Sequence, residues 1–281
     1  MSTIYTNAIR RASEIRLQLG LGLFHPINIY DVCAKLEVDV KFVDVDMEGL
    51  YVSLSNTPTI LLSSLRPFPR RVFTCGHELG HHVFNHGFKV DILLDENEDA
   101  AYKSSDEKLV DAFAAALLMP TAGIQAEFSK RKIDFDSANV IDFFTISCLF
   151  GVGYETLVWH CKINNLISKL KSDELLRLNP AKIFKKEFGN VGEKSFFKII
   201  DGKSAAMPID LEVSNYIVLP SEFLVDNVFL EKKLESKLGI LYLVKKSGIS
   251  NVYSNTSESA YFIRIQPQNY VGLAEYRHLE N

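Results

Sequence analysis

The sequence has 281 residues, of which 47% are hydrophobic and 23% charged, and its formal net charge is −4. These fractions are typical of a globular protein with a substantial core, and they exclude a disordered or fibrous chain. The small net charge indicates no polyanionic partner at the level of the whole chain. The N-terminal segment carries frequent charges and no signal-peptide core. No apolar run approaches the length of about 18 residues needed to span a bilayer, so we expect a cytoplasmic protein without membrane contact.

The four cysteines are Cys33, Cys75, Cys148 and Cys161. No two are close in sequence, and no C-x-x-C pair exists. This usage argues against a disulfide framework and against a thiolate zinc cluster. We expect all four to be reduced and mostly buried.

The first part of the chain alternates predicted helices with short strands. The predicted elements are, in order, a helix over residues 3–20, a short helix over 29–36, a strand over 38–45 and a hairpin with arms at 49–53 and 59–63. The segment Arg66–Arg71 is expected to be irregular and basic. A long helix should begin just after it and carry the run VFTCGHELGHHVFNH.

A polar, acidic connection then leads to a second helix, Glu107–Met119, which Pro120 ends. Residues 121–172 predict helices, and the charged segment 173–186 predicts a linker. Short β-rich runs follow. We therefore expect an α+β protein. Its expected parts are a metallopeptidase domain at 1–125, a helical segment at 126–172 and a separate, smaller α+β domain at 187–281.

The run HELGH places His77 and His81 four residues apart, on one face of a helix. Two imidazoles so placed can bind one zinc ion, which takes imidazole nitrogen at about 2.0–2.1 Å. Glu78 projects beside the metal, where a carboxylate can take a proton from a zinc-activated water. A histidine-rich surface helix is the alternative, but the flanking residues are apolar. Polar groups in a core need a partner. The sequence thus predicts one Zn²⁺ per chain, with Glu78 as the catalytic base.

A catalytic zinc also needs a third protein ligand. The metzincin spacing would place a histidine at Gly87, whereas His86 stands one residue earlier. Glu107 opens the second helix and can reach the metal. Asp111, four residues later, can accept the second N–H of a zinc-bound histidine. For Glu107 and Asp111 the alternative is an acidic helix start favoured by the helix dipole.

Other polar side chains compete for these roles. Asp106, Asp99 and Glu98 are alternative ligands. Ordinary solvation in a loop is the other interpretation of these residues, and it is favoured for Asp99 and Glu98. The additional histidines, His82 and His86, are interpreted as solvent-facing or hydrogen-bonded side chains.

A metallopeptidase binds its substrate in extended form, usually by pairing with an exposed strand edge. The arm TILLS is a candidate edge, with Ile60, Leu61 and Leu62 as substrate-binding residues, and an ordinary interior strand is the alternative. The oxyanion of the tetrahedral intermediate needs a donor besides zinc. Tyr102, between the two ligand helices, is a candidate for that role by its position alone.

The combination of RRVFTCGHELGHHVFNH with a second helix ending FAAALLMP resembles the ImmA/IrrE family of metallo-endopeptidases. The resemblance covers residues from about 25 to 122. It implies a zincin-like fold in which His77, His81 and Glu107 ligate zinc and Glu78 is the base. Family members resemble regulatory proteases that cut a helix-turn-helix repressor. Two departures, Val110 and the pair Cys75-Gly76, replace usual alanine and leucine-alanine residues and remove no ligand.

The segment IDFFTISCLFGVGYETLVWHCKINNLI is similar to the helix-turn-helix-like unit that follows the protease region in the IrrE branch. That branch then carries a GAF-like domain, which implies a sensor at the C-terminus here. The second helix of the segment offers few cations for phosphates, so DNA binding is not expected.

The expected function is cleavage of a helix-turn-helix repressor that switches on stress or mobile-element genes. The alternatives are the toxin half of a toxin–antitoxin pair and a non-catalytic transcriptional regulator.

Overall fold

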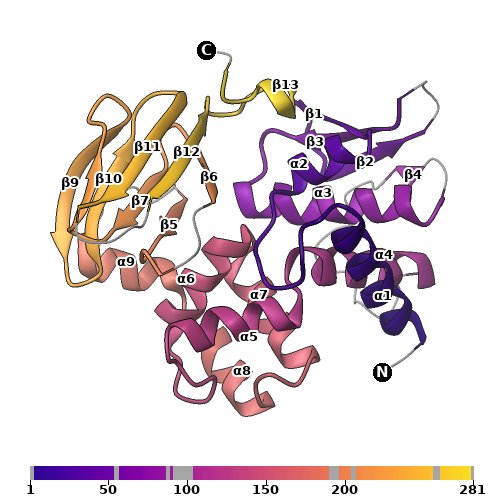
Figure 1. The fold of residues 1–281 in the computed structure, drawn as a ribbon, viewed down its shortest axis with the longest axis horizontal. Helices are drawn as coiled ribbons and strands as arrows, with labels where there is room; N and C mark the ends of the chain where they lie inside the picture. The colour runs from indigo at the N-terminus through magenta and orange to yellow at the C-terminus, as the bar shows by residue number, and fades with distance from the viewer. Residues whose placement is uncertain are drawn as a thin grey trace. The chain divides into compact units, whose positions relative to one another are not determined.

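The computed structural model describes residues 3–53, 57–86, 89–90, 104–189, 196–203, 207–255 and 260–279. The chain is mixed α+β and divides into two compact units (Figure 1). Unit 1 comprises Met1–Ala126, Phe150–Val152 and Val271–Glu275. Unit 2 comprises Glu127–Leu149, Gly153–Tyr270 and Tyr276–Asn281. The expected three-part layout stays a prediction.

Unit 1 is built on a five-stranded sheet with the strand order β13-β1-β3-β2-β4. Strands β1 and β3 are parallel, and the other neighbours are antiparallel. The strands are β1 (Asp39–Val43), β2 (Gly49–Val52), β3 (Thr59–Ser63), β4 (Lys89–Val90) and β13 (Gly272–Leu273). The predicted hairpin is confirmed as the antiparallel pair of β2 and β3.

Strand β3 lies inside this sheet. Its residues Thr59–Ser63 pair with β1 along one side, and Thr59–Leu62 pair with β2 along the other. Both rows of backbone groups are therefore occupied, and no substrate can add to this strand. The prediction that Ile60, Leu61 and Leu62 offer a free edge is wrong, and the interior strand is what the structure has. The side chains of Ile60 and Leu62 are fully buried.

The helices of unit 1 are α1 (Thr3–Gln18), α2 (Ile29–Lys35), α3 (Phe68–Val83) and α4 (Ser105–Leu118). Helix α3 packs on β2, β3 and α4, and α4 packs on α1 (Figure 1). Helix α3 begins inside the segment that was expected to be irregular. Pro69 stands in its first turn, where the missing N–H leaves no intrahelical bond unmade.

Two glycines on α3 set its distance from α4. A Cβ at Gly80 would lie 2.8 Å from Cβ of Val110, and one at Gly76 would lie 3.3 Å from Cβ of Ala114. The first separation is shorter than real side chains tolerate, so glycine is required at position 80 for this approach. Val110 and Ala114 are both fully buried. The two helices are thus in near-backbone contact over one turn.

A buried arginine fixes the N-terminal helix to α4. Arg16 is fully buried, and its guanidinium donates to the backbone carbonyls of Leu117, Gly22 and His25. Burial lowers the pKa of Arg16 to about 10. These acceptors include a carbonyl of the last turn of α4, which has no intrahelical partner. Arg16 therefore caps α4 from outside.

Helix α4 and the following α5 (Thr121–Lys130), with Met119 and Pro120 between them, together make a stretch that is long and apolar enough to span a membrane. By length and composition, the expectation that no run approaches this length is not met. However, 56% of the apolar window is buried within the protein, as expected for a core helix.

Unit 2 begins with helices α6 (Val140–Phe150), α7 (Tyr154–Ile163), α8 (Lys169–Leu176) and α9 (Pro180–Phe188). Helices α6 and α7 meet at 97° around the predicted glycine turn. The segment 173–186 is helical over most of its length, and its role as a linker stays a prediction. The side chain of Asn179 accepts from the N–H of Ala181, and Pro180 occupies the first turn of α9.

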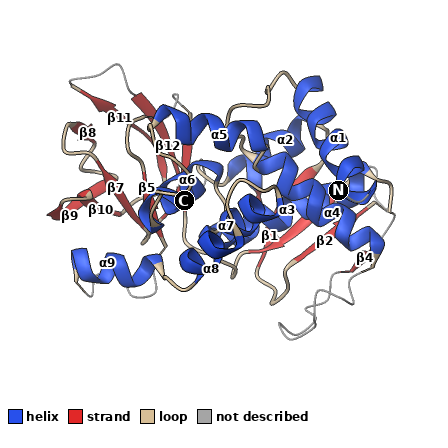
Figure 2. Ribbon diagram, turned by 90° about the horizontal axis from the view of Figure 1, so that it is seen from below, coloured by secondary structure: helices blue, strands red, loops and turns tan. Residues whose placement is uncertain are grey.

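The remainder of unit 2 consists of two four-stranded sheets, drawn in red in Figure 2. Their strand orders are β5-β7-β10-β9 and β6-β12-β11-β8. The strands are β5 (Phe197–Ile199), β6 (Pro208–Glu212), β7 (Tyr216–Leu219), β8 (Phe223–Val225), β9 (Leu230–Ser236), β10 (Gly239–Val244), β11 (Gly248–Ser254) and β12 (Ala260–Gln266). Residues of both sheets share one hydrophobic core, which includes Ile217, Leu219, Ile263 and Ile265.

The predicted β-rich runs are confirmed as strands, but the described elements between 197 and 266 include no helix. The α+β arrangement expected for 187–281 therefore differs from the structure. The sheets share one core, in which Leu149 of α6 also takes part. A GAF-like sensor stays a prediction.

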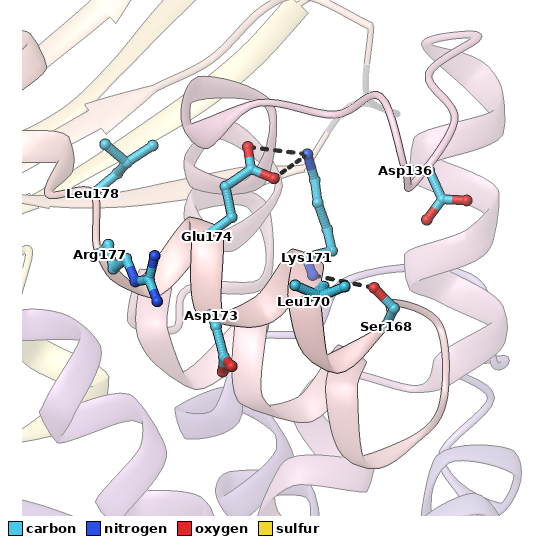
Figure 3. Close-up of a pocket in the computed structure, with 8 residues that line it drawn as sticks. All are labelled: Asp136, Ser168, Leu170, Lys171, Asp173, Glu174, Arg177 and Leu178. Carbon is cyan, nitrogen blue, oxygen red and sulfur yellow. Dashed lines mark hydrogen bonds and ion pairs between the residues drawn. The ribbon is translucent and has the colours of Figure 1, made fainter.

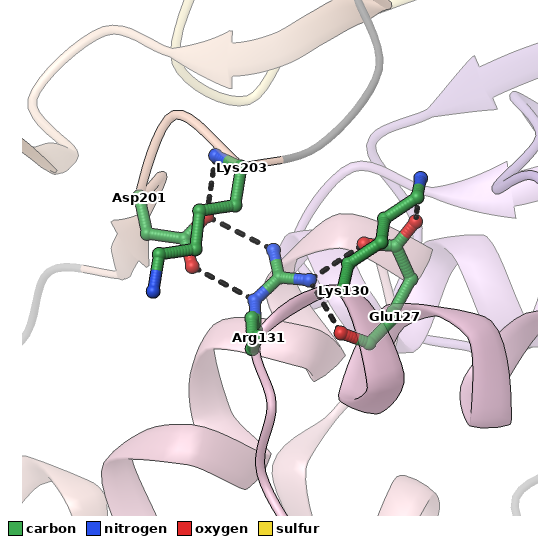
Figure 4. Close-up of polar contacts among 5 residues, drawn as sticks. All are labelled: Glu127, Lys130, Arg131, Asp201 and Lys203. Atoms are coloured by element: carbon green, nitrogen blue, oxygen red, sulfur yellow. Dashed lines mark hydrogen bonds and ion pairs between the residues drawn. The ribbon is translucent and has the colours of Figure 1, made fainter.

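A buried ion-pair network joins α5 to the loop between β5 and β6 (Figure 4). The guanidinium of Arg131 donates to both carboxylate oxygens of Asp201 at 2.8 and 2.9 Å. It also donates to Oε2 and to the carbonyl oxygen of Glu127 at 2.6 and 2.9 Å. The side chains of Arg131 and Glu127 are 2% and 1% exposed, so each charge depends on its partner.

The glycine contacts predict a graded loss of stability. Gly80→Ala should lower the free energy of unfolding by about 1–3 kcal/mol, because the new methyl group overlaps Val110. Gly76→Ala should cost less, because its Cβ would require Ala114 to move by only a few tenths of an ångström. Urea denaturation of both variants measures this order. Equal costs would show that the spacing of the helices is not set at Gly80.

The ion-pair network predicts a strong effect of Arg131→Met. Removal of the guanidinium leaves the buried Glu127 carboxylate with one cation fewer, which should cost about 3–5 kcal/mol. Lys130→Met is the matched control, because Lys130 binds the same carboxylate from a side chain that is 40% exposed. Thermal denaturation should separate the two variants clearly. Similar melting temperatures would contradict the assigned role of Arg131.

Candidate metal centre

The helices α3 and α4 bring three polar atoms into one small triangle. Nε2 of His77 lies 3.1 Å from Oε2 of Glu107 and 3.3 Å from Nε2 of His81. Nε2 of His81 lies 3.6 Å from the same Oε2. Among the described residues, these three form a group whose ligand atoms all lie within 4.8 Å of one another. The structure thus brings together three of the residues singled out in the sequence.

The triangle has the size that a tetrahedral zinc ion requires. Bonds of about 2.0–2.1 Å at tetrahedral angles separate neighbouring ligand atoms by roughly 3.3–3.4 Å. The three separations span 3.1 to 3.6 Å. Two imidazole nitrogens and one carboxylate oxygen are also the donor types that zinc prefers in catalytic sites. The residues therefore fit the ion in both geometry and chemistry.

Asp111 contacts His77 at the ring nitrogen that faces away from the triangle. Its Oδ1 lies 2.8 Å from Nδ1 of His77, one helical turn after Glu107. A carboxylate in this place accepts the Nδ1–H and leaves the lone pair on Nε2 free to bind a metal. Both carboxylates reach the histidine because α4 runs so close to α3.

The environment keeps the third ligand atom negative. Hydrogen bonds from His77 and His81 hold the pKa of Glu107 well below its usual range, although burial alone would raise it. The side chain of Glu107 is 22% exposed and that of His81 is fully buried. An ionised carboxylate in a largely buried site is a strong ligand for a divalent cation.

Glu78 is buried against the start of β2. Its side chain is 1% exposed, and a Cβ at Gly49 would lie 3.0 Å from its Oε1. Glycine at position 49 therefore leaves room for the Glu78 carboxylate between α3 and the sheet. This places Glu78 beside the helix face that carries the two histidines.

The remaining candidates are placed differently. Tyr102, Asp99 and Glu98 lie outside the described residues. Asp106 is not part of the metal-ligand group, whereas its neighbour Glu107 is. All four cysteines are buried thiols. Cys75 lies 3.7 Å from Cys33 through the two sulfur atoms, in keeping with a role in packing.

The additional histidines, His82 in α3 and His86 after it, are hydrogen-bonded, as one of the two expected interpretations has it, and the sequence did not identify their partners. Nδ1 of His82 lies 2.8 Å from the hydroxyl of Tyr51 on β2, and burial lowers the pKa of His82. Nδ1 of His86 lies 3.1 Å from Nδ1 of His81. The position of His86 after the helix gave no periodic signal, because the contact depends on how the helix ends.

A pocket of about 560 Å³ lies in unit 2, beside α8 (Figure 3). Its lining mixes the acidic residues Asp136, Asp173 and Glu174 with Lys171 and Arg177. Lys171 and Glu174 bind each other at 3.4 Å. The lining contains no histidine or cysteine and no excess of positive charge, so it offers neither a zinc site nor a phosphate site.

A comparison with known proteins finds a family match over the segment that contains this site. Residues 33–161 match the family model described as the IrrE N-terminal-like domain of peptidase M78. No curated protein is similar to the chain. A solved structure of a Mycobacterium tuberculosis transcriptional regulator is similar with 16% identity and a TM-score of 0.36, over 55% of this chain and 46% of that chain. The match thus spans less than half of that regulator, and it is too weak to support a conclusion. The segment 33–161, which includes the histidine helix and α4, is therefore assigned to the ImmA/IrrE family of peptidases.

Proposed function

We propose that the protein is a zinc-dependent endopeptidase that cleaves a helix-turn-helix transcriptional repressor and so switches on stress or mobile-element genes. The observation that carries the enzymatic part is the triangle of His77, His81 and Glu107, whose edges match those of a tetrahedral zinc site. The repressor as substrate is supported by the resemblance to regulatory proteases of the ImmA/IrrE family.

Each residue has a distinct role in this proposal. His77, His81 and Glu107 would hold one zinc ion, and Asp111 would orient His77. When bound, zinc supplies Lewis-acid polarisation of the peptide carbonyl and lowers the pKa of water. Glu78 would accept the proton from the attacking water and deliver it to the leaving amine. Its burial against Gly49 keeps this carboxylate in one orientation.

A DNA-reading transcription factor is the main alternative, and α7 does not favour it. The exposed side chains of this helix include Glu155, Trp159 and Ile163. Lys162 lies over the ring of Trp159 at 4.3 Å and 3.9 Å from Asp173. A recognition helix needs cations and amides free to meet phosphates and base edges. An acidic, aromatic face is better suited to contact with protein.

A non-catalytic regulator and the toxin of a toxin–antitoxin pair are further alternatives. A non-catalytic protein has no need of the Glu78 carboxylate beside the ligand helix. A toxin would use the same proteolytic chemistry, so only the identity of the substrate separates it from a repressor-cleaving protease.

The role of Glu78 is tested with Glu78→Gln. The amide cannot take a proton, so cleavage should fall by about 10²-fold or more while one zinc per chain is retained. Helix-turn-helix proteins encoded beside the gene serve as substrates, incubated with and without a chelator, and fragments are identified by mass spectrometry. Cleavage by Glu78→Gln at the parental rate would refute the mechanism.

The third ligand is tested by two neighbouring substitutions. Glu107→Ala should lose bound zinc, because it removes one of the three donor atoms. Asp106→Ala is the matched control, since it removes a carboxylate of the same helix turn that lies outside the ligand group. Metal content by atomic absorption measures both. Retention of zinc by Glu107→Ala, with loss by Asp106→Ala, would reassign the ligand.

A further inference from the structure

Helix α3 ends in a turn that folds the chain back over its last ligand. Asn85 has a φ of 56°, in the left-handed region that asparagine tolerates better than most residues. The N–H of His86 donates to the carbonyl of His81 at 3.0 Å, and the N–H of Asn85 donates to that of His82 at 3.1 Å. These two bonds form a Schellman motif. The motif delivers His86 to the side of His81.

The ring of His86 is held there by packing. It stacks on Phe84 with a centroid distance of 5.9 Å and an interplanar angle of 22°. Phe84 in turn packs edge-on against Phe113 of α4, at 5.6 Å. The rings of His81 and His86 meet at 65°, and their Nδ1 atoms are 3.1 Å apart. The contact is therefore supported from the backbone, from the helix end and from α4.

The chemistry of imidazole fixes the direction of this hydrogen bond. Two ring nitrogens at such a distance attract each other only if one carries a proton and the other a lone pair. His81 directs Nε2 towards His77 and Glu107. A neutral histidine that binds a metal through Nε2 carries its proton on Nδ1. The Nδ1–H of His81 must then donate to the Nδ1 lone pair of His86.

We propose that His86 is a positioning residue that holds His81 in the tautomer and ring orientation needed to bind zinc. It would do for His81 what Asp111 would do for His77, with an imidazole in place of a carboxylate. The inference rests on the proposed zinc-dependent function. It assigns His86 no contact with the ion or the substrate.

The test compares the zinc affinity of the full chain and its variants in competition with a chromogenic chelator. His86→Phe retains a ring that can stack on Phe84 and removes the acceptor, so zinc should bind about 10- to 100-fold more weakly. His86→Gln places an amide oxygen within reach of the same N–H and should recover most of the affinity. His82→Leu is the control. It removes the adjacent histidine, whose ring meets Tyr51 instead, and should leave the affinity unchanged.

Two further measurements separate positioning from folding. Thermal denaturation of the metal-free proteins shows whether the variants fold, and His86→Ala replaces His86→Phe if the phenyl ring is not accommodated. The visible spectrum of the cobalt-substituted protein should change in His86→Phe and return towards that of the parent in His86→Gln. The inference is overturned if the Phe variant binds zinc like the parent, or if the Gln variant is as weak as the Phe variant. If the parent protein itself binds no zinc, the proposed zinc-dependent function is refuted together with the role of His86. This outcome differs from the one in which the parent binds zinc and the His86 variants bind it equally well.

Discussion

The close approach of α3 and α4 is the constraint on which the candidate metal centre depends. Gly76 and Gly80 occupy the contact face of α3, where Ala114 and Val110 of α4 pack against them. On α3 the two histidines repeat the spacing of the glycines, because His77 follows Gly76 and His81 follows Gly80. Glu107 and Asp111 lie one turn apart on α4 and reach the histidines only at this separation. A wider spacing would leave the carboxylates short of the imidazoles, so the packing of small residues determines whether these side chains can meet.

The same region illustrates how a buried polar site is stabilised. Each histidine uses one ring nitrogen towards the ligand triangle and the other towards a supporting side chain, Asp111 for His77 and His86 for His81. Buried polar groups persist when their hydrogen-bonding capacity is met on all sides. The pKa of Glu107 is lowered by its hydrogen bonds with these two histidines. The centre is thus organised by three elements: α3, α4 and the turn that follows α3.

Local periodicity predicted much of this arrangement. The i, i+4 spacing of His77 and His81 and of Glu107 and Asp111 indicates which side chains share a helix face, and the structure brings these faces together. Local patterns could not predict the features that depend on tertiary contacts. Strand β3 is interior because β1, which precedes the hairpin in the chain, pairs with it in parallel on the side that β2 leaves open. The contact of His86 with His81 depends on a left-handed residue, Asn85, which has no periodic signature.

The predicted arrangement of unit 2 differs from the structure, also because it depends on tertiary contacts. Alternating apolar residues identify strands, but they do not indicate what covers each sheet. Here the two sheets share one core, to which α6 also contributes Leu149. In the charged segment 173–186, Asn179 and Pro180 start α9. This local signal for a helix start was not used in the prediction, which relied on the charge of the segment.

Strand β13 makes unit 1 dependent on distant sequence. Gly272 and Leu273 pair with Phe42 and Lys41 on β1, although more than two hundred residues separate them. The first unit is therefore discontinuous, and most of unit 2 is, in topological terms, an insertion before its last strand. A fragment that stops near residue 126 would expose the backbone of β1 along one side. Unpaired strand edges recruit other chains. Such a fragment would tend to self-associate through its sheet, for a reason unrelated to its metal ligands.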